Sequence, residues 1–240
     1  NELHRPWALK AAALGKHVLC EKPLGICVTD AAENVSGCRE AGVVLMEAFM
    51  WRHHPRVALA KQMIAEGKLG ELRLVKMDFS FVIDQNDWRL DAARGGGALY
   101  DLGCYGINIS RFFAGAEPTE IHARARHLLP LVDMTLAMQL QFPGNITALL
   151  DASFECPDRN RFELVGTKGT LEFPGGVLPP EEATLLYRTA SGTETITLPA
   201  ADQYTGMIEC FARSVAAGRL EAPAEDGLAN MRVVEAVRDA

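Results

Sequence analysis

The pattern of apolar residues differs between the N-terminal part and the rest of this chain of 240 residues. Up to residue 50, helical patterns at 6–14 and 31–41 alternate with apolar runs at 17–20 and 43–49. Between residues 117 and 198, by contrast, strand-like runs follow one another with short turns between them. Alternating helices and strands favour a parallel sheet, whereas consecutive strands with short connections favour an antiparallel one. The pattern therefore predicts an α/β protein with two differently built parts.

The N-terminal part supplies only a fraction of a parallel α/β domain. We expect Gly15 and Gly42 to end its two helices and Thr29 to cap the start of the second. A doubly wound dinucleotide-binding fold needs about six strands. The chain has only about two such strand units at this end and no Gly-x-Gly-x-x-Gly phosphate-binding turn. We interpret residues 1–51 as the remnant of a Rossmann domain whose other units precede Asn1.

Residues 52–240 have the pattern of an α+β domain. Helical patterns lie at 55–66, 98–113, 203–217 and 226–239, and a long extended run lies at 70–83. Seven further strand-like runs lie at 120–128, 134–142, 146–154, 161–165, 170–173, 183–187 and 194–198. We expect a large, mainly antiparallel open sheet with helices on one face, which leaves the other face free to pair with a second subunit.

Composition narrows the class of ligand. The apolar fraction of 48% and the charged fraction of 23% are those of an ordinary globular protein. The net charge is −7 without a basic stripe, and no apolar run approaches the length of a membrane span, so neither nucleic acid nor membrane is an expected partner. The six cysteines show no zinc-like spacing, which argues against a metal site and favours a cytoplasmic protein.

Three side chains suit proton transfer to and from a hydroxyl group. Lys22 follows the apolar run 17–20, at the carboxyl end of a predicted parallel strand, where open α/β sheets bind their ligands. Pro23 stops that strand and fixes the direction in which Lys22 leaves it. Asp101 and Tyr105 are four residues apart in the predicted helix 98–113 and should share a face. Such a set predicts redox chemistry on an alcohol or a sugar.

Each of these residues also has a simpler interpretation. A lysine at a strand end is commonly solvated, and a helix with one polar stripe is common. Glycines 95–97 would let a ligand approach the helix N-terminus, and Gly103 and Gly106 would leave space around Tyr105. Glycine equally permits close packing of the helix against a neighbouring helix. Both interpretations stay open at this point.

Further polar and aromatic residues are candidates for ligand binding. Arg52, His53 and His54 follow the second apolar run, and therefore also lie at the carboxyl end of a predicted strand. Trp88 and Arg89, shortly before the glycine triplet, would supply an aromatic wall and a cation for a hydroxylated ligand. A surface or interdomain salt bridge is the more common fate of such residues.

Several ordered motifs resemble the Gfo/Idh/MocA family of nicotinamide-dependent sugar and polyol oxidoreductases. They are GKHVLCEKPL at 15–24, EAFMWRHHP at 47–55, the glycine-rich segment around Asp101 and Tyr105, GTKGTL at 166–171 and EDGLANM at 225–231. Many members similar to inositol dehydrogenase have histidine in place of Tyr105. Tyrosine there resembles the branch that contains glucose–fructose oxidoreductase, NADP-linked D-xylose dehydrogenase and dimeric dihydrodiol dehydrogenase.

The resemblance implies NAD or NADP as the cofactor, a sugar, polyol or diol as the substrate, and a homodimer or homotetramer formed through the C-terminal sheet. It places Lys22 near the nicotinamide, with Asp101 and Tyr105 completing the catalytic site. We expect the cofactor to contact Glu21, Lys22, Pro23, Trp51 and Arg52, and the substrate to contact His54, Trp88, Arg89 and Gly97.

Our hypothesis makes Tyr105 the general acid/base, while Lys22 lowers the pKa of Tyr105 and orients the substrate. Asp101 would bond the substrate or hold Lys22. The alternative is a non-catalytic sensor of a sugar or dinucleotide with the same fold, although a sensor has no need to keep these three residues together. A lyase with Lys22 as a Schiff-base nucleophile is a third hypothesis.

Overall fold

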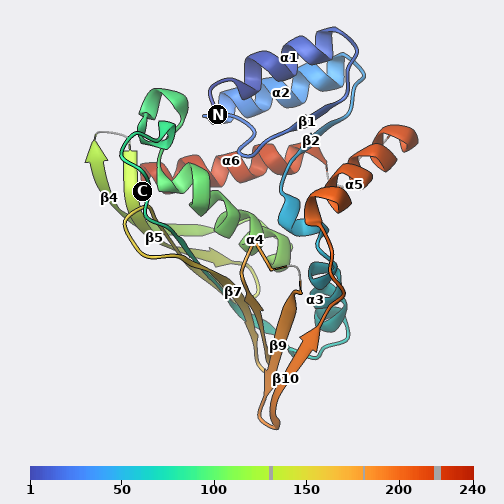
Figure 1. Cartoon of the computed structure of the whole chain (residues 1–240), viewed down its shortest axis with the longest axis vertical. Coiled ribbons are helices and arrows are strands. Elements are labelled where there is room, and N and C mark those ends of the chain that lie inside the picture. Colours follow the sequence, from blue (N-terminus) through green and yellow to red (C-terminus); the bar gives the residue numbers. More distant parts are fainter. Residues whose placement is uncertain (130–131, 181, 219–222) are drawn as a thin grey trace.

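The computed structural model describes residues 1–129, 132–180, 182–218 and 223–240, and it contains two sheets. A two-stranded parallel sheet with two helices forms one end of the molecule, and an eight-stranded sheet with its helices forms the rest (Figure 1). This arrangement confirms the predicted fold class. Among the described residues, no helix combines the length and the apolar character needed to cross a bilayer.

The N-terminal end consists of α1 (His4–Ala13), β1 (Val18–Cys20), α2 (Val28–Glu40) and β2 (Leu45–Glu47). The two strands pair in parallel, and α1 packs on α2. β2 is shorter than predicted, because a 3-10 turn, η1 (Met50–His53), follows it closely. The predicted cap of α2 is wrong. The backbone of Cys27 is extended and its sulfur accepts the amide of Asp30 at 3.4 Å, whereas Thr29 already lies inside the helix.

Eight strands form the large sheet, in the spatial order β10-β9-β8-β7-β3-β6-β5-β4. Their bounds are β3 (Leu72–Ser80), β4 (Glu120–Leu129), β5 (Val132–Phe142), β6 (Ile146–Ser153), β7 (Arg159–Gly166), β8 (Thr170–Pro174), β9 (Thr184–Thr189) and β10 (Gly192–Thr197). Neighbouring strands are antiparallel except for β3 and β6, which are parallel. The sheet is therefore mainly antiparallel, as predicted.

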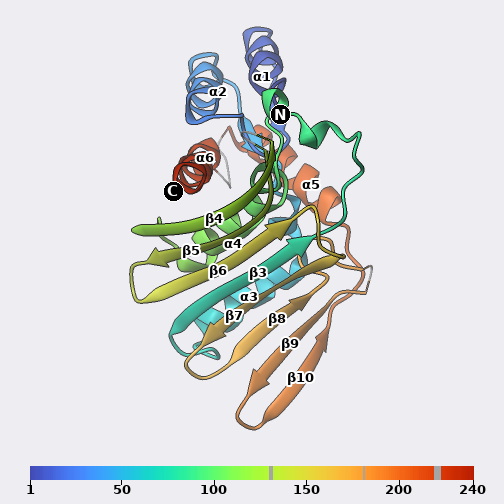
Figure 2. The same ribbon diagram turned by 90° about the vertical axis from the view of Figure 1, so that its left-hand side faces the viewer.

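Alternation along the strands gives this sheet a covered face and an open face. In β5, for example, Leu136, Met138 and Leu140 are buried, whereas Ala137 and Gln139 between them are exposed. The helices α3 (Pro55–Ala65) and α4 (Cys104–Ala114) lie behind the sheet on the covered side (Figure 2). The core of the molecule lies between these helices and the sheet.

One helix links the small sheet to the large one, and a second packs on the turn that follows β2. α6 (Ala224–Asp239) packs on α2 and β2 and also on α4 and β4, while α5 (Gln203–Ala217) packs on η1. Two 3-10 turns, η2 (Trp88–Leu90) and η3 (Ala92–Arg94), and a π-helical turn, η4 (Leu99–Gly103), connect β3 to α4. The carboxyl end of β1 meets the η4 turn, and the candidate site lies where they meet.

Candidate active site

Lys22 connects the end of β1 to the η4 turn. It leaves the carboxyl end of β1, and its Nζ donates to the backbone oxygen of Asp101 at 2.7 Å and to Asp101 Oδ1 at 2.8 Å. Only 12% of the Lys22 side chain is exposed. Lys22 is therefore not the solvated strand-end lysine of the simpler interpretation.

Asp101 is held by two cations. Besides Lys22, Arg89 places its Nε 2.8 Å from Asp101 Oδ2. Arg89 also pairs with Asp87 at 3.2 Å, and the Asp87 carboxylate accepts the Arg89 amide at 2.9 Å, which caps η2. Three of the predicted residues thus form one chain of ion pairs. Because both carboxylate oxygens of Asp101 are engaged, this arrangement favours the holding of Lys22 over the binding of substrate.

Tyr105 lies against Lys22 in a mostly buried position. The Lys22 ammonium lies 4.8 Å from the centroid of the Tyr105 ring, which makes a cation–π contact. The Tyr105 hydroxyl donates to Met50 Sδ at 3.5 Å, and the ring packs edge-on against Phe49. A thioether sulfur is a weak acceptor, so the hydroxyl remains ready to bond a stronger oxygen acceptor.

The pKa values of both Tyr105 and Lys22 are raised. Burial raises the pKa of Tyr105, and the charge of Lys22 opposes this rise only in part. Lys22 therefore acts in the predicted direction, but desolvation of the phenolate outweighs its attraction to the ammonium, so the net pKa of Tyr105 is raised. Burial also disfavours the charge of Lys22, but the acidic groups around it, Cys104, Tyr105 and Asp101, raise its pKa overall. At neutral pH the pair is an ammonium and an un-ionised phenol.

A π-helical turn shapes the segment that carries Asp101 and Tyr105. The predicted helix 98–113 begins as η4 and becomes α4 only at Cys104. A Cβ at Gly103 would lie 3.1 Å from Met138 Cε, and one at Gly106 would lie 3.3 Å from the Leu150 methyls. These two glycines therefore serve close packing, and the partner is the sheet rather than another helix. π-helical turns occur frequently at functional sites.

Trp51 and Arg52 belong to a buried polar network between the two parts of the chain. Trp51 is 1% exposed, and its indole N–H donates to Asn108 Oδ1 at 3.2 Å. Arg52 Nε donates to the same oxygen at 2.9 Å, and Arg52 pairs with Asp226 of α6 at 2.7 Å. Arg111 pairs with Asp226 as well, at 3.0 Å. Arg52 thus forms a salt bridge, but a mostly buried one within residues 52–240 rather than one between domains, and contact of Trp51 and Arg52 with a cofactor stays a prediction.

His54 and Gly97 also have neighbours within the protein. His54 is 1% exposed, and its Nδ1 accepts the Arg56 amide at 3.2 Å, which caps α3. Gly97 has a φ of +111°, and a Cβ there would overlap the carboxylate of Asp133. The space at Gly97 is therefore filled by a side chain from β5. Contact of either residue with a substrate stays a prediction.

The other predicted contacts lie close to Lys22 or Arg89. Glu21 is exposed, and its carboxylate accepts the Lys22 amide at 3.2 Å. Pro23 is buried, and its carbonyl accepts from His4 Nδ1 at 2.7 Å. The Arg89 guanidinium lies 5.0 Å from the centroid of the Trp88 ring. Their predicted ligand contacts also stay predictions.

Three neighbours of the site were not predicted. Met50 receives the Tyr105 hydroxyl, and Cys104 lies beneath Asp101, with its Sγ 3.7 Å from the Asp101 carbonyl. Tyr204 lies at the start of α5. Burial and the charge of Glu21 raise the pKa of Tyr204, and the charge of Lys22 opposes this rise, so Tyr204 lies near enough to interact with both charges. Met50 could have been predicted as a site residue, since it lies in the motif after β2. No local pattern in the sequence predicts that α5 lies near the site.

Comparison with known proteins identifies the family. Residues 1–49 match the model of an oxidoreductase family with an NAD-binding Rossmann fold, and residues 57–172 match the GFO/IDH/MocA C-terminal domain. D-xylose 1-dehydrogenase (NADP(+)) 2 of Haloferax volcanii is 34% identical over 243 residues, which cover 99% of this chain and 74% of the relative. The chain belongs to the Gfo/Idh/MocA family. Membership confirms the predicted oxidoreductase class and the nicotinamide cofactor.

Other relatives in the family act on different compounds. Trans-1,2-dihydrobenzene-1,2-diol dehydrogenase of Oryctolagus cuniculus is 38% identical over 69% of this chain and 51% of its own length. Among solved structures, KijD10, a 3-ketoreductase from Actinomadura kijaniata in complex with NADP and TDP-benzene, is 34% identical with a TM-score of 0.91 over 99% of this chain and 74% of its own. An aldose-aldose oxidoreductase from Caulobacter crescentus is 30% identical, also with a TM-score of 0.91, over 100% of this chain and 74% of its own.

The position of the site fits the family's cofactor. Lys22 and Pro23 follow the carboxyl end of β1, which pairs in parallel with β2, and parallel sheets bind nucleotides at this edge. The weakly bonded Tyr105 hydroxyl lies beside it. Contact of Lys22, Pro23 and Tyr105 with the nicotinamide end stays a prediction.

Proposed function

We propose that the protein is an NAD(P)-dependent dehydrogenase that acts on the hydroxyl-bearing carbon of a sugar, a polyol or a diol. The supporting observation is the place of Lys22, whose ammonium is fixed by Asp101 and lies over the Tyr105 ring. A fixed cation beside a buried phenol is suited to hold a substrate oxygen while the phenol exchanges a proton with it. The names of relatives that act on D-xylose and on a dihydrodiol support the substrate class, and those names and complexes favour NADP.

The proton and the oxygen are handled by this chain's residues. When bound, the nicotinamide supplies or accepts the hydride. In the direction of reduction, Lys22 donates a hydrogen bond to the substrate carbonyl, and Tyr105 delivers its hydroxyl proton to the same oxygen. The raised pKa of Tyr105 keeps it protonated for this step, and the charge of Lys22 stabilises the phenolate that remains. Asp101 keeps the ammonium in place throughout.

A substitution at Tyr105 tests this proposal. A panel of aldoses, polyols and diols is assayed in the full-length protein with NAD and NADP, and reduced nicotinamide is followed by absorbance. Tyr105→Phe should lower kcat by about 10²–10⁴ and leave dinucleotide binding nearly intact. Tyr100→Phe is the matched control, because the Tyr100 hydroxyl donates to the Ile26 carbonyl at 2.9 Å and serves the fold. Near-normal turnover in Tyr105→Phe would remove Tyr105 from this role.

The same panel separates an enzyme from a sensor. A catalyst changes the nicotinamide absorbance with at least one substrate class. A sensor binds a sugar or a dinucleotide in calorimetry and changes no absorbance with any member of the panel. The latter result would replace the dehydrogenase by the sensor. We also propose a cytoplasmic location, because all six cysteines are free thiols.

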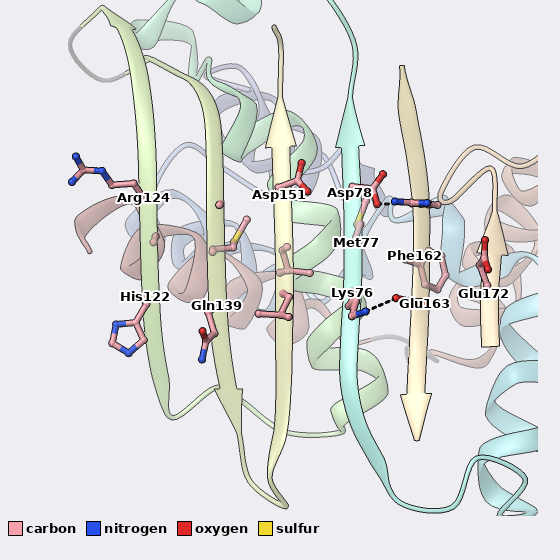
Figure 3. A pocket seen from close by; sticks show the side chains of 16 residues that line it. Lys76, Met77, Asp78, His122, Arg124, Gln139, Asp151, Phe162, Glu163 and Glu172 are labelled. Carbon is pink, nitrogen blue, oxygen red and sulfur yellow. Dashed lines mark hydrogen bonds and ion pairs between the residues drawn. The ribbon is translucent and has the colours of Figure 1, made fainter. Parts of the chain in front are cut away.

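We also propose that a second copy of the chain covers the open face of the large sheet. Figure 3 shows this face, a hollow of about 690 Å³ with charged side chains of both signs. Arg124 of β4 lies at one edge of it and Glu172 of β8 at the other. A two-fold axis that lies in the interface, parallel to the strands, would place the edge with Arg124 in one copy over the edge with Glu172 in its partner. Leu149, which is 41% exposed, lies on β6 between these edges.

The mass of the particle in solution tests the dimer. Light scattering coupled to size-exclusion chromatography should give twice the chain mass or a multiple of it. Leu149→Glu should shift the particle to a monomer, because a buried unpaired charge opposes association. Leu178→Glu, at a comparably exposed leucine outside this face, is the control. A monomer already in the wild type would exclude this interface.

A further inference from the structure

Asp133 reaches from the sheet into the start of the helical segment that carries Asp101 and Tyr105. It is near the start of β5 and 8% exposed, and its Oδ2 accepts the Leu99 amide at 2.7 Å. Its Oδ1 occupies the place where a Cβ of Gly97 would lie. A carboxylate from a different element thus takes the role that an N-cap side chain usually has, and it satisfies an amide that has no partner within the helix.

Both partners of the contact between Asp133 and residues 97–99 are suited to it. Gly97 has a φ of +111°, a conformation that favours glycine, and the absent side chain is what admits the carboxylate. Burial raises the pKa of Asp133, and its hydrogen bond with the Leu99 amide opposes this rise. A buried carboxylate costs free energy unless it is hydrogen-bonded, so the bond to Leu99 is needed for Asp133 to be tolerated there.

The same turn determines where Asp101 lies. The Asp101 amide donates to the Gly97 carbonyl at 3.2 Å, and Leu99 is two residues before Asp101. The Asp101 carbonyl and carboxylate then hold Lys22. The contacts therefore run without a gap from Asp133, through residues 97–101, to the Lys22 ammonium over the Tyr105 ring.

We propose that Asp133 is a positioning residue, which holds residues 97–101 so that Asp101 aligns Lys22 with Tyr105. It touches none of the reacting groups and acts through the backbone of Leu99 and the space at Gly97. The kinetic part of this inference rests on the proposed dehydrogenase function, whereas the structural part does not.

A matched device elsewhere in the molecule supplies the control. Asn160 of β7 accepts the Val177 amide at 3.0 Å through its Oδ1, and the same oxygen occupies the place of a Cβ at Gly176. Gly176 has a φ of +48°. Asn160 therefore makes the same type of contact as Asp133, but the segment that it holds follows β8 and carries none of the proposed catalytic residues. Loss of the Asn160 side chain should therefore lower the stability of the protein without changing its turnover.

The experiment compares Asp133→Ala, Asp133→Asn and Asn160→Ala in the full-length protein. Asp133→Ala should lower kcat on the order of 10²-fold, the size expected from a displacement of about 1 Å in a catalytic group, with a much smaller change in KM. Asp133→Asn keeps an oxygen that accepts from Leu99 and should recover most of kcat. Asn160→Ala should lower Tm and leave kcat unchanged. A loss of kcat in Asp133→Ala no larger than in Asn160→Ala would overturn the proposal.

Amide hydrogen exchange gives a second measurement that needs no activity. Peptides that cover residues 97–105 should exchange faster in Asp133→Ala and at the wild-type rate in Asn160→Ala. If the wild type turns over no substrate in the panel, the dehydrogenase proposal fails, and exchange alone decides the positioning. If peptides in 97–105 exchange at the wild-type rate in Asp133→Ala, the positioning role of Asp133 is overturned. Should Asp133→Ala yield no folded protein, Asp133→Ser, whose hydroxyl is too short to reach Leu99 in the same way, carries the same test.

Discussion

The Lys22 ammonium donates to both the backbone oxygen and the carboxylate of Asp101, at 2.7 and 2.8 Å. A residue from the end of a parallel strand is thereby tied to the first turn of a helical segment on the other sheet. The lysine that the proposed chemistry needs is consequently held by the same residue in two ways. Loss of the Asp101 carboxylate alone would leave one of these two bonds in place.

Lys22→Met should abolish most turnover without unfolding the protein. The change removes the cation over Tyr105, while Asp101 Oδ2 keeps its ion pair with Arg89. We expect kcat to fall by about 10²–10³, as for the loss of one fixed donor. Stability should fall by about 1–3 kcal/mol, since a buried acceptor loses its partner. Steady-state kinetics and urea unfolding measure both, with the exposed Lys16→Met as the control. An unaltered kcat would contradict a catalytic role for Lys22.

Glu47 should make the protein less stable as pH rises. Its carboxylate is buried, and burial raises its pKa from 4.5 to about 7, although the nearby Arg52 opposes this rise. Because the folded pKa lies above the unfolded one, the folded state favours the protonated carboxyl. Its contribution is complete below pH 4.5 and is lost as pH rises through about 7, to a total of roughly 3 kcal/mol.

Glu47→Gln should remove this pH dependence. Urea unfolding on both sides of the window measures it, and the exposed Glu40→Gln should keep the wild-type profile. Parallel profiles for the wild type and Glu47→Gln would show that Glu47 has an ordinary pKa.

His54 should make the protein less stable as pH falls, which is the opposite of the effect of Glu47. Burial, and then the nearby Arg56, lower the pKa of His54 from 6.5 to about 4. A folded pKa below the unfolded one means that the neutral ring is favoured. This contribution is complete above pH 6.5 and is lost as pH falls towards 4. His54→Asn keeps a capping side chain for α3 and should flatten the acid side of the Tm profile, whereas His54→Leu should also cost about 1 kcal/mol at neutral pH. A steep acid limb that persists in His54→Asn would assign it to other groups.

Arg52→Lys should separate packing from cofactor binding. A lysine cannot reproduce the two directions in which Arg52 bonds Asn108 and Asp226, so stability should fall by about 1–3 kcal/mol. We expect the dissociation constant for NADPH, measured by fluorescence in the full-length protein, to stay within about twofold, because Nε and Nη2 of that guanidinium bond Asn108 and Asp226 within the protein. A large rise in this constant would instead assign Arg52 to the cofactor.

Local patterns in the sequence were enough to predict the order of the helices and strands, whereas the meeting of Lys22 with Asp101 and Tyr105 was implied by the family resemblance. A strand end and a helix face are local features, and the motifs that contain them are contiguous. The partners of Trp51 and Arg52 were not predictable, because Asn108 and Asp226 come from two distant helices. The raised pKa of Tyr105 depends on burial among Phe49, Met50 and the sheet, which no spacing reveals. The role of Gly97 likewise depended on a carboxylate from β5.

α6 contacts α2 and β2 on one side and α4 and β4 on the other. It is a rigid brace between the part that carries Lys22 and the part that carries Asp101 and Tyr105. A helix with both sides packed resists any hinge between these parts, so Lys22 and Tyr105 hold their relative position before a ligand arrives. We therefore expect ligand entry to be controlled by segments outside the brace, such as the turn η2 that carries Arg89, and differences in substrate preference between relatives to arise there.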